Sequence, residues 1–71
     1  LVLFMGELPL AAVDRIIRKA SGLRVSESAA VELARLLEEE GMRLSLKAKA
    51  LAEHAKRKTI TADDIRLAAR Q

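Results

Sequence analysis

Residues 26–55 read SESAAVELARLLEEEGMRLSLKAKALAEHA, and this stretch decides the fold. It contains no proline, and its apolar residues recur at steps of three and four, which is typical of one amphipathic helix. Ser26 is a good N-cap, and Glu27 complements the helix dipole. A helix of about thirty residues is ~45 Å long. The apolar stripe that we expect along it consists of Ala29, Leu33, Leu36, Leu37, Leu44, Ala48, Leu51 and Ala55.

A shorter helix is predicted before the long one. Pro9 suits the first turn of a helix, because the N–H that it lacks would be unpaired there in any case. Apolar residues then follow at helical spacing as far as Ala20. Ser21-Gly22 ends this helix, since glycine suits the left-handed conformation of a helix terminator. Residues 23–25 form a short extended connection to the long helix.

A second short helix is predicted after the long one. Residues 55–60 read AKRKTI, in which three basic residues precede a β-branched pair, and we interpret them as an exposed extended loop. Thr61 and Asp64 then occupy the first and fourth positions of a capping box. An apolar face follows from Ile65 to Ala69. The predicted fold class is therefore all-α, with a long central helix between two short ones.

The size of the chain predicts a partner. With 71 residues it is one domain, and a monomer of this size buries only roughly 60% of the surface that its unfolded chain exposes. No cysteine is present to form a disulfide. Two short helices cannot cover an apolar stripe of ~45 Å, so another copy or a similar chain must cover it. We place the domain at residues 7–71 and expect residues 1–6 to be a flexible N-terminal extension.

Composition narrows the class of partner. The net charge of +3 favours a polyanion if the positive charge is concentrated. Phe4 is the single aromatic residue, whereas proteins that bind single strands stack bases on aromatic rings, so a duplex is favoured. No apolar run approaches the ~20 residues of a membrane span, and residues 1–5 are too short for a signal peptide. We expect a cytoplasmic location and no membrane partner.

Catalytic chemistry is not predicted. The sequence shows no paired carboxylates, no nucleophile beside a base and no glycine-rich phosphate loop. His54 is the single histidine, and without cysteine it cannot build a metal site. Glu38-Glu39-Glu40 is typical of a solvated acidic face. We expect no enzyme activity, no metal, no cofactor and no small-molecule substrate.

The order and spacing of these pieces resemble those of the archaeal histones from Glu7 to Arg70. The resemblance implies the histone fold, in which two chains form an antiparallel handshake dimer and the long helices cross near their middles. Each end of such a dimer brings the first loop of one chain beside the second loop of the other. The segments that carry the resemblance are Glu7-Leu8-Pro9-Leu10, Asp14-Arg15-Ile16-Ile17-Arg18-Lys19, Arg24-Val25-Ser26, His54-Ala55-Lys56-Arg57-Lys58-Thr59-Ile60 and Ala62-Asp63-Asp64-Ile65.

By this resemblance the loops bind double-stranded DNA. Arg24 would enter the minor groove, whose negative potential attracts arginine, and Thr59 of the other chain would hold it. Arg15, Arg18 and Lys19 lie on successive turns, which alone is typical of a solvated polar face. Combined with the loops they become a surface that follows phosphates. The predicted DNA-binding residues are Arg15, Arg18, Lys19, Arg24, Arg57, Lys58 and Thr59.

The resemblance implies two further contacts near the second loop. Arg57 and Asp64 would form an ion pair within the chain that braces this loop against the last helix. Leu51, His54, Asp64 and Leu67 would form the contact between two dimers, with the histidine pairing with the aspartate across it. Apart from the resemblance, a lone histidine at the end of a helix is explained by the helix dipole.

Three residues need separate interpretation. Lys56 stands where many archaeal histones have glycine. Gly41 either is a tolerated weak point of the long helix, at a cost of ~1 kcal/mol against alanine, or marks a close crossing of two helices. Leu46 lies off the apolar stripe, at a position where a polar residue is expected, and the sequence gives no firm reason for it.

The predicted function is sequence-nonspecific binding of double-stranded DNA, by which homodimers and larger assemblies wrap and compact the chromosome at the nucleoid. The main alternative is a histone-fold transcription-factor subunit that works with a different partner chain. A protein-interaction module that never meets DNA is opposed by the clustered cations. A helix-turn-helix regulator is opposed by the length of the central helix.

Overall fold

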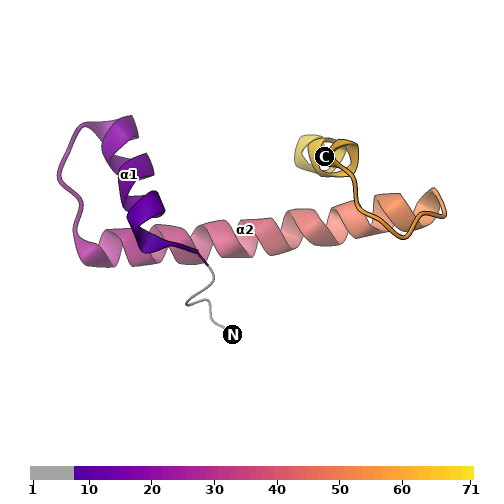
Figure 1. Cartoon of the computed structure of the whole chain (residues 1–71), viewed down its shortest axis with the longest axis horizontal. Coiled ribbons are helices and arrows are strands. Elements are labelled where there is room, and N and C mark those ends of the chain that lie inside the picture. The colour runs from indigo at the N-terminus through magenta and orange to yellow at the C-terminus, as the bar shows by residue number, and fades with distance from the viewer. Residues whose placement is uncertain (1–7) are drawn as a thin grey trace. The chain divides into compact units, whose positions relative to one another are not determined.

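The computed structural model describes residues 8–71 and shows an all-α chain, as the sequence predicts (Figure 1). Its helices are α1 (Leu10–Ser21), α2 (Glu27–His54) and α3 (Ala62–Arg70), and residues 8–71 form no strand. The chain divides into two compact units, one ending at Glu39 and the other beginning at Glu40, and α2 contributes to both. The predicted N-terminal extension, residues 1–6, lies outside the described residues.

Local capping signals set the ends of the helices. At the start of α2, the Ser26 hydroxyl accepts a hydrogen bond from the Ala29 N–H at 3.1 Å, which confirms the predicted N-cap. At the end of α1, Gly22 is left-handed, with φ 72°, and its N–H donates to the Arg18 carbonyl at 2.8 Å. The prediction for Pro9 was wrong by one position, because Pro9 is the N-cap of α1 and has extended backbone angles.

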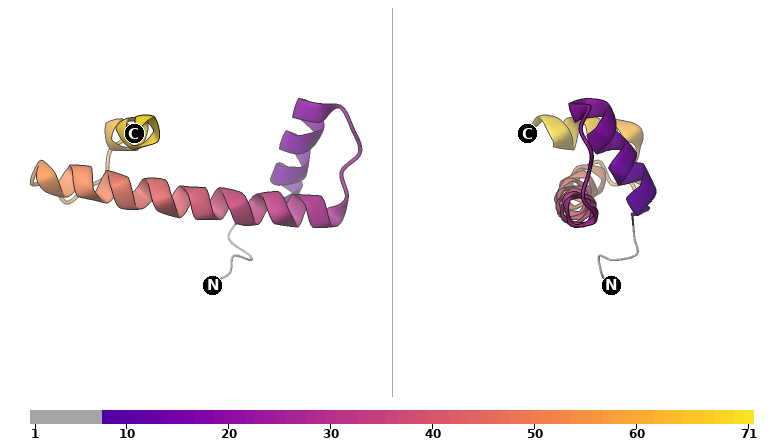
Figure 2. Two further views of the ribbon diagram at one scale, coloured as in Figure 1. Left: turned by 180° about the vertical axis from the view of Figure 1, so that it is seen from behind. Right: turned by 90° about the vertical axis from the view of Figure 1, so that its left-hand side faces the viewer.

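The first unit packs α1 across the N-terminal part of α2 (Figure 2). Val13 of α1 is buried against Ala30 and Ala34 of α2. The alanines have little side chain, so the two helices approach closely. The partly buried apolar residues around this cluster are Leu8, Ile17, Val25 and Leu33.

The second unit contains the C-terminal part of α2, the second loop and α3. Ala48 and Ala52 of α2 and Ala68 of α3 are its buried apolar residues. The predicted capping box is present, because the Thr61 hydroxyl accepts from the Asp64 N–H at 3.3 Å and the Asp64 carboxylate accepts from the Thr61 N–H at 2.9 Å.

The predicted apolar stripe of α2 is partly wrong for a single chain. Ala29 and Ala55 are exposed, whereas three alanines that the prediction missed are buried. The reason is that α2 has two adjacent apolar faces. The alanine face, Ala30, Ala34, Ala48 and Ala52, packs within the chain. The leucine face, Leu33, Leu36, Leu37, Leu44 and Leu51, is exposed or half-buried.

A single chain therefore has a poor core. None of its described residues is both large and fully buried. Leu36 is 45% exposed, and Leu37 is 41% exposed, although both lie in the middle of the longest helix. Burying an apolar side chain of this size stabilises a fold by about 1.5–3 kcal/mol, and the single chain forgoes nearly half of that gain at these positions. The leucine face needs a cover.

Candidate nucleic-acid interface

The cations of α1 differ in their partners. Arg15, Arg18 and Lys19 are all exposed. Arg18 donates from Nε to the Asp14 carboxylate at 2.7 Å, a pair one helical turn apart. Arg15 and Lys19, which are also one turn apart, form no ion pair with any residue from 8 to 71. The neighbouring acid thus neutralises Arg18 in part and leaves the other two charges on the surface.

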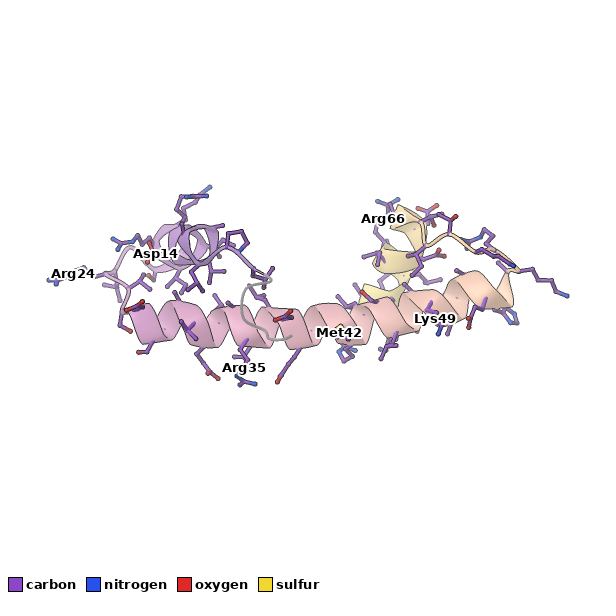
Figure 3. All side chains as sticks on the ribbon, turned by 60° about the horizontal axis from the view of Figure 1, so that its bottom comes forward. Asp14, Arg24, Arg35, Met42, Lys49 and Arg66 are labelled. Carbon is purple, nitrogen blue, oxygen red and sulfur yellow. The ribbon has the colours of Figure 1, made fainter. Side chains whose placement is uncertain are left out.

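The first loop fixes the position of Arg24. The Ser21 hydroxyl donates to the Ile17 carbonyl at 2.7 Å and accepts from the Leu23 N–H at 3.1 Å, so it ties the start of the loop to α1. At the other end, Val25 packs against the core cluster of the first unit. Arg24, held between these two points, is exposed and extends away from the helices of its unit (Figure 3).

The N-terminus of α1 presents backbone N–H donors. Its N-cap, Pro9, makes no side-chain capping bond, and the first turn contains no acid. The N–H groups of Ala12 and Val13 donate to the Pro9 carbonyl. Those of Leu10 and Ala11 precede them and have no acceptor among the hydrogen bonds of the described chain. This end of the helix carries a partial positive charge and suits an anion.

The second loop begins with a tight helix terminator. The Lys56 N–H donates to the Glu53 carbonyl and the Arg57 N–H to the Ala52 carbonyl, each at 2.9 Å. These two bonds define a Schellman motif, in which the first of the two donor residues adopts a left-handed backbone conformation. Lys56 occupies that position with φ 62°, and no other non-glycine residue of the described chain has a positive φ. The unexpected lysine therefore stands where the backbone favours glycine.

Arg57 and Asp64 form a two-pronged ion pair. The two terminal nitrogens of Arg57 donate to the two carboxylate oxygens of Asp64, each at 2.8 Å, and one of them also donates to the Thr59 carbonyl at 3.0 Å. Asp64 is 5% exposed. The Arg57 guanidinium and the Thr61 N–H hold the pKa of the Asp64 carboxyl well below its usual range. This pair braces the second loop against α3.

Lys58 and Thr59 project from the braced loop. Both are exposed, and Lys58 forms no ion pair with the described residues. A depression of about 620 Å³ lies beside them in the second unit. Its lining is mainly basic and apolar: Lys49, Ala52, Glu53, Lys56, Arg57, Lys58 and Ile60. The loop thus gathers cations that have few acids beside them.

The residues proposed for a contact between dimers lie around the same loop. His54 is the last residue of α2 and is exposed, while Leu67 of α3 is 46% exposed. Leu51 is half-buried. Asp64 uses both carboxylate oxygens within its own chain, and no hydrogen bond joins it to the His54 of that chain.

Three arginines of α2 and α3, Arg35, Arg43 and Arg66, are paired with neighbouring acids, which the sequence-based prediction missed, whereas Arg70 forms no ion pair with the described residues. Arg35 pairs with Glu32 and Glu39, at 2.6 and 2.5 Å. Hydrogen bonds from Arg35 lower the pKa of Glu32. Arg43 pairs with Glu40, and Arg66 pairs with Asp63 at 2.5 Å. Spacings of three and four residues were the available signal. The paired acids weaken the attraction of these three arginines for a polyanion.

Residues 8–71 lack two kinds of feature. They contain no group of three or more His, Asp or Glu side chains arranged to hold a metal ion. They also contain no helix with the length and apolar character that a membrane crossing requires.

Comparison with known proteins identifies the family. Residues 6–69 match the family described as histone-like transcription factor (CBF/NF-Y) and archaeal histone. The chain belongs to this family. It is 55% identical over 64 residues to one subunit of the archaeal histone HAN1 of Thermococcus zilligii, covering 90% of this chain and 96% of the relative. It is 46% identical over 66 residues to the probable archaeal histone 3 of Methanocaldococcus jannaschii, covering 93% and 98%. Its three helices therefore form the histone fold.

Proposed function

We propose that this chain is a DNA-packaging histone, which binds double-stranded DNA without regard to sequence as a handshake homodimer. The observation that carries the proposal is the placement of cations without an ion pair. Arg15, Lys19, Arg24, Lys56 and Lys58 form no ion pair with the described residues and lie on α1 and the two loops, where the family resemblance places DNA. Arg35, Arg43 and Arg66 of α2 and α3 are paired with acids, whereas Lys47, Lys49 and Arg70 of these helices are not.

The leucine face of α2 supports the dimer. It runs past the middle of the helix, and two of its residues, Leu36 and Leu37, are exposed in the single chain. A second α2 crossing there would bury both. Gly41 lies beside these residues, and a Cβ added to it would meet no atom within 4 Å in the single chain. The space that a close crossing needs is therefore open.

Binding is proposed to be electrostatic and to follow the shape of the duplex. Arg24 would enter a minor groove, and Thr59 of the other chain would hold it. Arg15, Lys19 and Lys58 would bind phosphates. The backbone N–H groups of Leu10 and Ala11 at the start of α1 would bind another phosphate. No residue of this set is placed to distinguish one base from another in the major groove.

Wrapping and compaction would require contacts between dimers. We assign this contact to Leu51, His54 and Leu67, together with Asp64, and the chain would then act on the chromosome. The alternative, a transcription-factor subunit with a different partner chain, is less well supported, because the two similar proteins named above are archaeal histones.

The loops are tested by duplex binding. Arg24→Ala should weaken binding strongly while the dimer stays folded, because the side chain is exposed. Lys58→Ala should weaken binding evenly across sequences and reduce the salt slope by about one. Arg43→Ala is the matched control, since it removes a cation that Glu40 already pairs, and it should bind as the parent does. Unchanged affinity in both loop variants would refute this interface.

Assembly is tested separately by nuclease digestion of the protein–DNA complex. Leu67→Glu should leave a folded dimer that binds DNA but yields only short protected fragments instead of a ladder. A parent-like ladder from this variant would place the contact between dimers elsewhere.

A further inference from the structure

The first loop exposes a leucine to an unusual degree. Leu23 is 70% exposed, and no other large apolar residue from 8 to 71 is as exposed. Val25, two residues later, packs against the core cluster of the first unit. Single exposed leucines are common on protein surfaces and need no explanation by themselves. Leu23 differs from these, because local hydrogen bonds hold it away from the helix on which such a residue ordinarily packs.

Ser21 holds the leucine out. A residue that follows a left-handed glycine frequently packs back onto the last turn of the helix, and its N–H bonds to a carbonyl of that turn. In α1 the Arg18 carbonyl accepts from the Gly22 N–H instead, at 2.8 Å. The Leu23 N–H donates to the Ser21 hydroxyl at 3.1 Å, and Leu23 does not belong to the apolar residues that pack against the core cluster. The loop therefore presents this side chain outward.

The surroundings of Leu23 in the loop are cationic. Arg24 follows it directly, is exposed, forms no ion pair with the described residues and extends away from the helices of its unit (Figure 3). Lys19, in the last turn of α1, is also exposed and without an ion pair in the described chain. The sequence contains no acid between Lys19 and Ser26. An occupant that suits this arrangement has apolar surface directly beside negative charge.

Deoxyribose in a DNA duplex has this combination, because apolar sugar faces adjoin the phosphates along the minor groove. That groove is ~6 Å wide, and consecutive Cα atoms of a chain are about 3.8 Å apart. With the Arg24 guanidinium in the groove, the side chain of the preceding residue therefore lies at the groove wall. Minor-groove proteins use apolar side chains, leucine among them, in contact with DNA. A protein partner is less well matched, since it needs a cluster of large side chains and this loop exposes one.

We propose that Leu23 packs against the deoxyribose wall of the minor groove and makes the first loop selective for DNA over RNA. This role rests on the DNA-binding function proposed above and adds a residue that recognises the sugar. An RNA duplex displays 2′-hydroxyl groups in its minor groove, and a hydroxyl covered by leucine loses water without gaining a hydrogen-bond partner. Leu23 is thus a specificity-determining residue, which accepts any base sequence but disfavours ribose.

Binding to DNA and RNA duplexes of the same sequence tests this role. Each labelled duplex is short enough for one dimer, and fluorescence anisotropy measures the affinity of the whole chain. Leu23→Ser removes apolar surface and no charge, so it should weaken DNA binding about tenfold with an unchanged salt slope. Affinity for the RNA duplex should stay the same, so that the ratio of DNA affinity to RNA affinity falls about tenfold.

Two control variants separate the leucine from general effects of substitution. Leu23→Met keeps an apolar side chain of similar volume and should bind both duplexes as the parent does. Leu46→Ser makes the same change at another leucine, which is 63% exposed on α2, and should leave both affinities unchanged.

The proposal is overturned if Leu23→Ser binds DNA as the parent does, or if it loses affinity for both duplexes equally. It is also overturned if Leu23→Ser lowers the thermal stability of the dimer and leaves its DNA affinity unchanged, since the other chain would then cover the leucine. Arg24→Ala and Lys58→Ala on the same duplexes show which proposal has failed. Weakened DNA binding in these two but not in Leu23→Ser refutes the sugar contact alone, whereas parent-like binding in all three refutes the DNA interface itself.

Discussion

Lys56→Gly should stabilise the protein, because the native backbone forces a lysine into a left-handed conformation. Lys56 has φ 62° and is fixed there by the two bonds of the Schellman motif. An L-residue in this region costs about 1–2 kcal/mol, whereas glycine adopts it freely. Glycine loses about 0.5–1 kcal/mol more conformational entropy on folding, so the net gain is about 0.5–1 kcal/mol per chain. If two chains unfold together, the gain per dimer is twice that.

Thermal and urea unfolding followed by circular dichroism would measure this gain, and a gain of 1 kcal/mol raises Tm by about 4–8 °C in a domain of this size. Lys56→Gln is the matched control, because it removes the charge and keeps the left-handed side chain, so its stability should stay near that of the parent. Gly22→Ala should lower the stability, since Gly22 has φ 72°. A Lys56→Gly protein no more stable than Lys56→Gln would show that the left-handed backbone is not strained.

Three further predictions concern the core of the fold. Thr61→Ala removes the hydroxyl of the capping box and should lower the free energy of unfolding by about 1 kcal/mol in urea titrations, whereas a parent-like midpoint would contradict the cap. The folded-state pKa of Asp64 is below its usual range, so the stability that it contributes is full above about pH 4 and is lost as the pH falls toward the folded value. Asp64→Asn should thus lose stability at pH 7 but lose less on acidification, and equal acid losses in the two proteins would count against the ion pair. Gly41→Ala should destabilise the dimer if two helices cross closely there, while a gain of about 1 kcal/mol per chain would show a merely tolerated glycine.

The ends of the helices were predictable because their signals act within a few residues. The Ser26 hydroxyl accepts a hydrogen bond from the N–H three residues later, and Thr61 and Asp64 form two hydrogen bonds with each other. Gly22 can end α1 because a glycine adopts a positive φ without strain. Such signals do not depend on how the helices pack, so the sequence suffices to find them.

The packing faces of α2 were less predictable. Periodicity identifies which residues are apolar, but it cannot tell which of two adjacent faces meets a helix of the same chain. Alanine and leucine count alike in such a pattern, yet Ala34 is fully buried and Leu36 is 45% exposed. Close approach within the chain selects the small residue, and the large one is left for a partner.

The residues of the candidate interface could be predicted from the sequence, but which of their charges are paired with acids was not predicted. The spacing of four residues between Asp14 and Arg18 was the available signal for their ion pair, but the prediction did not use it. Thr59 was predicted to hold Arg24 of the other chain, and in this structure its carbonyl also accepts a hydrogen bond from Arg57. Contact of these residues with DNA is still a prediction, tested by the loop variants above.

The distribution of ion pairs explains how a chain with a net charge of only +3 can bind a polyanion. Four of the ten acids, Glu32, Glu39, Glu40 and Asp63, pair with arginines of α2 and α3, so these four do not offset the cations of α1 and the loops. Affinity for a duplex depends on the charges within about one Debye length, ~8–10 Å, of the phosphates, and not on the total. Placing one further acid next to Arg24 should therefore cost more affinity than removing a paired arginine, although both changes lower the net charge by one.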